Sequence, residues 1–118
     1  GPAMTASMHA LIAARLGRAA DSETYFRVSY RPFVRGAFLL FSEKRTLDRC
    51  VFTTGAGGIL QSVIYGFGGV DYDQWDKIPT TKPTLPPTWK SLTLRGVQYR
   101  GKRYTITTTP EKRTVVEE

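Results

Sequence analysis

The chain has 118 residues, of which 41% are hydrophobic and 23% charged, and its formal net charge is +7. This length suits one ordinary domain or two very small ones, and the apolar content excludes a chain that is disordered by composition. One cysteine and one histidine exclude an internal disulfide and argue against metal sites built from several such residues, so we expect no cofactor. No apolar run approaches the ~18 residues of a membrane-spanning helix.

Two helices are predicted near the start of the chain. The first covers residues 4–16, where apolar side chains recur at helical spacing, and Gly17 is its expected C-cap. The second is expected to begin with Asp21 or Ser22 as its cap and to end near Tyr30. Because the connection between them is short, the two helices are predicted to form an antiparallel pair.

Residues 33–52 form a connection that is unusually long for a compact domain without a function of its own. Within it, Glu43 follows an apolar run and precedes Lys44 and Arg45. Apolar surroundings raise the pKa of a carboxyl group, which makes Glu43 a candidate general base. The alternative is a surface glutamate that is paired with Lys44 or Arg45.

A glycine-rich stretch, Thr53-Thr54-Gly55-Ala56-Gly57-Gly58, precedes an apolar segment with helical spacing at residues 59–67. The free N–H groups at a helix start favour oxygen-rich ligands, and glycine permits a ligand or backbone to come close. The alternative is a helix start that packs tightly against a neighbouring element. Gly66, Gly68 and Gly69 are expected to end this helix.

The second part of the chain is predicted to be β structure. Four of the seven prolines fall between Pro79 and Pro87, and this bridge is expected to be non-helical and to separate an α half from a β half. Alternation over residues 89–109 predicts a β-hairpin that turns at Arg100-Gly101, with a short last strand near 114–116. The basic polar face of the hairpin leaves RNA or single-stranded DNA binding open beside an ordinary solvated sheet face.

Several stretches are familiar in combination: HALIAARLG at 9–17, FSE at 41–43, TTGAGGILQ at 53–61 with YGFGG at 65–69, and WKSLTLRG at 89–96. Together they resemble the C-terminal end of glycoside hydrolase family 65, from about Met4 to Thr109. That family holds acid trehalases, kojibiose hydrolases and the phosphorylases of maltose, trehalose and kojibiose. Residues 47–50 depart from the polar or aromatic residues expected there.

The resemblance implies an α+β fold that is part of a larger enzyme. Residues 4–70 would be the last helices of an (α/α)6 catalytic barrel, residues 71–88 a Pro-rich linker, and residues 89–118 a small antiparallel, jelly-roll-like sheet domain. Residues 1–3 are typical of a tag-cleavage scar. The remainder of the barrel, with the general acid, would come from the missing upstream part or from another copy of the chain. Too few helices and strands are present to cover one another, which agrees with this interpretation.

The resemblance also implies a reaction, because the family inverts the anomeric centre. In a hydrolase a second carboxylate must activate water, whereas a phosphorylase holds phosphate with serine and histidine residues instead. Since no histidine lies between Glu43 and Gly55, we expect a hydrolase. The resemblance assigns the general base to Glu43 and places Thr53, Thr54 and Gly55 in the substrate pocket.

The expected partner is an α-linked glucose disaccharide such as trehalose or kojibiose, with no nucleic acid and no membrane. The isolated piece is expected to be inactive, since it holds only one of the two carboxylates. A disaccharide phosphorylase, or a non-catalytic carbohydrate-binding or structural module, remains the alternative. The lone cysteine leaves the location open and slightly favours the cytoplasm.

Overall fold

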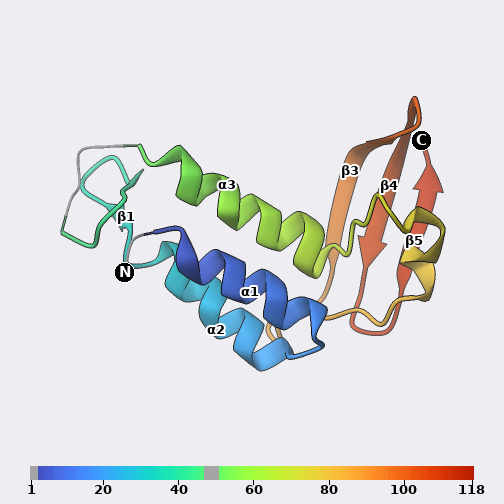
Figure 1. Cartoon of the computed structure of the whole chain (residues 1–118), viewed down its shortest axis with the longest axis horizontal. Helices are drawn as coiled ribbons and strands as arrows, with labels where there is room; N and C mark the ends of the chain where they lie inside the picture. The colour runs from blue at the N-terminus through green and yellow to red at the C-terminus, as the bar shows by residue number, and fades with distance from the viewer. Residues whose placement is uncertain (1–2, 47–50) are drawn as a thin grey trace.

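The computed structural model describes residues 3–46 and 51–118, and the α+β class is confirmed. Three helices run side by side, and an antiparallel sheet stands across one end of them (Figure 1). The helices and strands are α1 (Thr5–Arg15), α2 (Ala19–Tyr30), β1 (Val34–Arg35), β2 (Leu40–Phe41), α3 (Thr53–Gln61), the π-helix η1 (Ser62–Phe67), the 3₁₀ helix η2 (Trp75–Thr80), β3 (Leu92–Tyr99), β4 (Lys102–Thr108) and β5 (Arg113–Glu117).

The predicted antiparallel pair of α1 and α2 is confirmed. Gly17 ends α1 with a φ of +75°, a conformation that glycine adopts without strain. The N–H groups of Gly17 and Arg18 donate to the carbonyls of Ala14 and Ala13, which satisfies the last turn of the helix. The sequence therefore located this helix end correctly.

The predicted start of α2 at Asp21 or Ser22 is wrong, because the helix already begins at Ala19. The hydroxyl of Ser22 donates back to the Ala19 carbonyl over 2.8 Å from inside the first turn. Asp21 forms an ion pair with Arg18 just before the helix. Both residues therefore lie inside the first turn and do not cap it. The Asp21 carboxylate is still favourable there, because it is near the positive end of the helix dipole.

The glycine-rich stretch differs most from its prediction, because it lies inside α3 rather than before it. Glycine in a helix costs about 1 kcal/mol relative to alanine. Here close packing offsets that cost: a Cβ at Gly55 would collide with the Ala3 carbonyl and the Phe41 ring, and one at Gly58 with the Ser7 hydroxyl. The tight packing considered as the alternative is thus what these two glycines provide.

The predicted helical segment at 59–67 is confirmed, because α3 continues directly into η1. Its seam against α1 is made of small residues, which let the two backbones come close. The Ser62 hydroxyl donates to the Ser7 carbonyl over 2.7 Å, and Gly66 lies against Leu11 and Ala14. Gly66 is therefore part of the helix, and only the glycines after Phe67 end it.

The Pro-rich stretch contains part of a short helix, and some of its residues are buried. Pro79 belongs to η2, so the non-helical prediction is wrong there; proline's fixed φ near −65° fits a 3₁₀ turn. Farther along, Thr84, Leu85 and Pro86 are buried. Leu85 packs with Ala14 and Phe67 in a core cluster that joins the helices to this segment.

The predicted hairpin and last strand are confirmed as a three-stranded sheet in the order β3-β4-β5. Its turn falls at Arg100-Gly101, where both residues have positive φ values. Ile106 in the central strand faces Leu94 on β3 and Val115 on β5. Fully buried, it belongs to a core cluster with residues 70, 75 and 78, so the sheet is packed against the end of the helical layer.

Candidate functional site

The candidate base, Glu43, follows the short hairpin of β1 and β2 at the end of the molecule farthest from the large sheet (Figure 1). Backbone hydrogen bonds fix the chain around it. The N–H of Ser42 donates to the Phe33 carbonyl over 2.8 Å, and the N–H of Ala3 donates to the Glu43 carbonyl over 3.0 Å. The candidate residue is therefore part of an ordered, hydrogen-bonded segment and not of a loose loop.

The start of α3 lies next to this segment. The N–H of Phe52 donates to the Phe41 carbonyl over 2.8 Å, and Gly55 packs against the Phe41 ring and the Ala3 carbonyl. Ala3 thus contacts both Glu43 and Gly55. The structure brings two of the predicted site residues to one end of the molecule, although twelve positions separate them in sequence.

The first turn of α3 has no side-chain cap at Phe52. Thr53 and Thr54 are exposed on this turn, whereas Gly55 is buried. An uncapped helix start presents backbone N–H groups and a positive dipole end, which suit sugar hydroxyls, water or a carboxylate. The two hydroxyl side chains add donors and acceptors at the same place.

The side chain of Glu43 is half-buried. In residues 3–46 and 51–118, no ion pair joins it to Lys44 or Arg45, which was the alternative weighed for it. Arg45 instead lies over the Phe33 ring, 5.4 Å from its centroid. Residues 47–50, including Cys50 and the segment that departs from the family pattern, lie outside the described residues.

Ser42, next to Glu43, is fully buried, and its hydroxyl has no hydrogen-bond partner among the described atoms. Burying such a group unpaired costs roughly 1–3 kcal/mol. The sequence placed Ser42 in a motif but gave no reason for its burial, which depends on its pairing with Phe33.

Metal-binding geometry is absent from the described part of the chain. No group of three His, Cys, Asp or Glu side chains there is arranged to hold a metal ion. The single histidine, His9, packs edge-on against Tyr25 with centroids 5.2 Å apart. Of the helices that the structure describes, none has both the length and the apolar character needed to cross a membrane.

The basic face of the hairpin is partly neutralised by two glutamates at the C-terminal end of the chain. Lys102 pairs with Glu117 at 3.6 Å and Arg103 with Glu118 at 3.3 Å. A hydrogen bond from the Thr105 hydroxyl, with further contributions from the Gly96 N–H and Arg103, lowers the pKa of Glu118. These acidic partners reduce the positive field that a nucleic acid would use.

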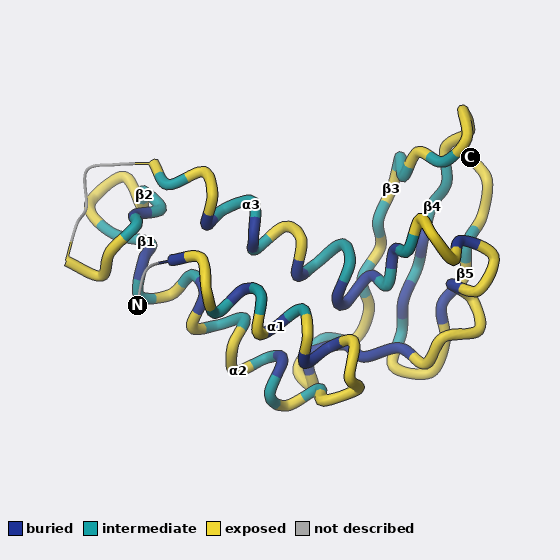
Figure 2. Tube along the Cα trace, viewed as in Figure 1, coloured by how far each residue is buried: buried dark blue, intermediate teal, exposed yellow. Residues whose placement is uncertain are grey.

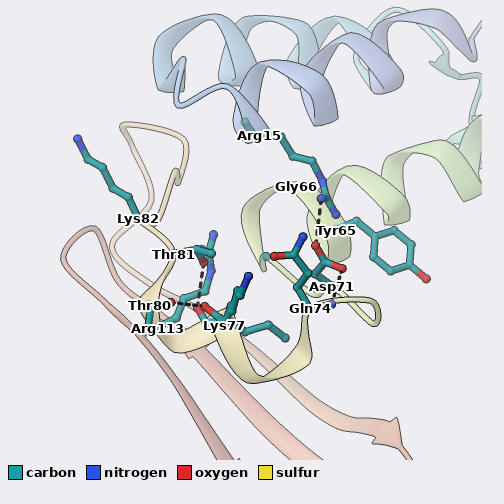
Figure 3. A pocket seen from close by; sticks show the side chains of 13 residues that line it. Arg15, Tyr65, Gly66, Asp71, Gln74, Lys77, Thr80, Thr81, Lys82 and Arg113 are labelled. Carbon is teal, nitrogen blue, oxygen red and sulfur yellow. Dashed lines mark hydrogen bonds and ion pairs between the residues drawn. The ribbon is translucent and has the colours of Figure 1, made fainter.

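Sequence reasoning missed a pocket at the opposite end of α3 and η1. Its lining includes Arg15 from α1, Asp71 after η1, Lys77 from η2 and Arg113 from β5 (Figure 3). These positions are far apart along the chain and belong to no shared motif. Only the folded arrangement shows that they meet.

Comparison with known proteins gives a consistent family. Residues 75–118 match the model of the glycosyl hydrolase family 65 C-terminal domain. A kojibiose hydrolase of Flavobacterium johnsoniae is 38% identical over 106 residues, which cover 90% of this chain and 16% of that enzyme. A protein-glucosylgalactosylhydroxylysine glucosidase of Dictyostelium discoideum is 33% identical over 90% of this chain and 15% of its own length.

A cell wall acid trehalase of Arthroderma benhamiae is 32% identical over 111 residues, covering 86% of this chain and 10% of that enzyme. The chain therefore spans about a sixth or less of the length of these curated relatives. All three relatives are named as enzymes that act on glycosides. Since these similarities cover 86–90% of this chain, they extend beyond the matched domain to the segment that contains Glu43 and to α3.

Proposed function

The chain belongs to glycoside hydrolase family 65, and from this premise we propose that it is the C-terminal portion of an inverting α-glucoside hydrolase. Its substrates are disaccharides of the trehalose or kojibiose type, in line with the names of its relatives. Within that enzyme this chain supplies the general base, Glu43. The general acid lies in a part of the barrel that these residues do not include.

The observation that carries the proposal is that the backbone of Glu43 and the first turn of α3 both contact Ala3. Both are held against Ala3, one by a hydrogen bond and the other by close packing at Gly55. A carboxylate beside an uncapped helix start can position a water molecule between its own oxygen and the free N–H groups. The side chain is half-buried and forms no ion pair with Lys44 or Arg45 in the described part of the chain, which supports a role as proton acceptor.

Inversion requires two carboxyl groups on opposite faces of the sugar. The acid protonates the leaving oxygen while the base removes a proton from the attacking water, and the two carboxyls lie ~6.5–9.5 Å apart to leave room for that water. In the proposed reaction Glu43 takes the water proton. Thr53 and Thr54, with the α3 N–H groups near Gly55, hold the oxygens of the water and the sugar.

The outer face of the helix pair supports attachment to further barrel helices. Four large apolar side chains are exposed on this face: Ile12, Leu16, Tyr25 and Val28. Two shallow hollows between α1 and α2 lie among these side chains. Exposed positions recur along all three helices in Figure 2. Apolar surface of this kind marks a contact with another protein surface. We propose that the rest of the (α/α)6 barrel covers it, either from the same polypeptide or from another copy.

The reaction is tested by incubating the complete enzyme with kojibiose and with trehalose in phosphate-free buffer and following the released glucose by proton NMR. The proposal predicts that the glucose whose C1 is attacked appears first as the β-anomer. Trehalose is then expected to give β- and α-glucose in equal initial amounts, because the leaving glucose keeps its α configuration. Early release of α-glucose alone from trehalose, without an equal amount of the β-anomer, would contradict inversion. Release of glucose 1-phosphate that depends strictly on added phosphate would assign the chain to a phosphorylase, and no turnover of either kind would favour a non-catalytic module.

A further inference from the structure

A pocket of about 240 Å³ lies where the helical layer meets the sheet. It is formed by the end of α1, the turn after η1, the helix η2 and the first residue of β5 (Figure 3). Four basic residues and one acidic residue line it: Arg15, Lys77, Lys82, Arg113 and Asp71. In Figure 3, Arg15, Lys77 and Arg113 surround the same hollow, whereas Lys82 reaches away from it.

Arg113 is the most unusual of these residues, because it is only 5% exposed. Its guanidinium donates to the Thr81 hydroxyl over 2.7 Å and to the Phe67 carbonyl over 3.2 Å, and its Nε has no hydrogen-bond partner in the described part of the chain. None of the ion pairs within residues 3–46 and 51–118 involves Arg113. A buried cation without an anionic partner is strongly unfavourable.

Neighbouring backbone groups leave room for this guanidinium and contact it closely. A Cβ at Gly69 would collide with Arg113, and Gly69 also has a φ of +70°, which favours glycine. The Phe67 carbonyl belongs to the C-terminal end of η1, where the helix dipole is negative. That dipole offsets part of the charge, but neither described partner of Arg113 carries a full negative charge.

The neighbouring cations increase the positive potential of the pocket. Arg15 pairs with Asp71 at 3.7 Å, a long and half-exposed contact, and Lys77 forms no ion pair among the described residues. Burial, and then the charge of Arg15, lower the pKa of Arg113 below its usual value. Arginine nevertheless keeps its proton at neutral pH, so the charge stays and is offset only in part by the η1 dipole.

The size of the pocket limits what it can hold. Sites for drug-sized ligands usually measure ~300–1,000 Å³, so this one suits a smaller molecule. A planar guanidinium with two neighbouring flexible cations matches a doubly charged tetrahedral oxyanion, which accepts several charge-assisted hydrogen bonds at once. A single carboxylate offers one charge and two oxygens, and would leave the pocket positive.

We propose that this pocket is a binding site for a small phosphate-type oxyanion, held by Arg113, Arg15 and Lys77. Bound there, the anion would connect α1, η2 and β5 and thereby fix the sheet to the helical layer. The site is separate from the catalytic end of the chain. The continuous helix formed by α3 (9 residues) and η1 (6 residues) lies between the two ends. At roughly 1.5 Å per residue it is on the order of 20 Å long.

Two probes separate the two sources of such an oxyanion: inorganic phosphate and glucose 6-phosphate, a phosphate monoester. Each is titrated into the full chain by isothermal calorimetry, against sodium chloride of matched ionic strength. The proposal predicts saturable binding of at least one probe and a rise in Tm with its concentration, since a ligand of the folded state stabilises it. If only inorganic phosphate binds, the ligand is the free ion. If glucose 6-phosphate binds more tightly than phosphate, the ligand is a phosphate monoester. Failure of both probes to bind beyond the chloride control overturns the proposal.

The variant Lys77→Gln tests the site without touching a buried group. Loss of one charge-assisted hydrogen bond is expected to weaken binding at least about 10-fold. Lys90→Gln removes the same charge from an exposed position outside the pocket and is expected to bind as the unmodified chain does. Equal affinities of the two variants would contradict the site. Because the readout is anion binding, this result is independent of whether the enzyme hydrolyses a glucoside.

Discussion

The sheet half and the helical half of the molecule bury their apolar side chains to different extents. Ile106 in β4 is fully buried, and Val70, Trp75 and Ile78 close over it. On the helices, Ile12 is 53% exposed and Leu60 is 60% exposed. The sheet half thus has most of its own core, although Val116 remains exposed there. The helical half leaves large apolar side chains exposed, which is the surface that the proposed barrel would cover.

The sharpest test of this contrast is to replace one isoleucine by alanine in each half and to compare the two losses of stability. Replacing Ile106 by Ala is expected to destabilise the chain by about 2–5 kcal/mol, because the lost methyl groups leave a cavity in a fully buried site. Ile12→Ala removes the same atoms from an exposed position and is expected to change stability by less than about 0.5 kcal/mol. Urea unfolding followed by tryptophan fluorescence measures both.

The difference between the two halves would be contradicted if, in the isolated chain, Ile12→Ala lowered the free energy of unfolding as much as Ile106→Ala. That result would place Ile12 in a core that the chain forms alone or with a second copy. In the complete enzyme, by contrast, the cost of Ile12→Ala is expected to rise, since the remaining barrel then covers the side chain.

A second pair of substitutions tests the close packing at the start of α3. Gly55→Ala is expected to cost about 1–3 kcal/mol, because the new Cβ would collide with a backbone carbonyl, that of Ala3, which cannot turn aside. Gly57→Ala is the matched control. A Cβ there meets nothing within 4 Å, so the change is expected to stabilise α3 by up to about 1 kcal/mol.

The same urea transitions measure the glycine pair. Equal effects of the two substitutions would show that Gly55 is not held against Ala3 and Phe41. The contact between the Glu43 segment and α3, on which the proposed site depends, would then be absent.

Local patterns in the sequence predicted most of the regular elements. The stripe on α1, the turn at Arg100-Gly101 and the last strand were each readable from a few neighbouring residues. The start of α3 was not, because glycine disfavours helices and only a tertiary contact explains Gly55 and Gly58 there. The burial of Leu85 in a Pro-rich stretch was missed for the same reason, since Ala14 and Phe67 supply its surroundings.

The candidate site, too, could be predicted from the sequence only in part. Its residue types came from the family resemblance, and the structure adds that Glu43 and Gly55 share Ala3 as a neighbour. Their catalytic roles stay predictions. The cationic pocket could not be foreseen, because Arg15 and Arg113 look like ordinary surface charges until folding buries one of them beside the other.

The most direct test of the central proposal is the turnover number of the complete enzyme carrying Glu43→Gln. This change keeps the size of the side chain and removes its basicity, so kcat on kojibiose or trehalose is expected to fall ~10²–10⁴-fold while substrate binding and Tm stay close to those of the unmodified enzyme. Glu111→Gln, which neutralises an exposed carboxylate of the sheet half, is the matched control and is expected to keep full activity. A Glu43→Gln enzyme that folds and turns over at the unmodified rate would contradict the assignment of Glu43 as the base.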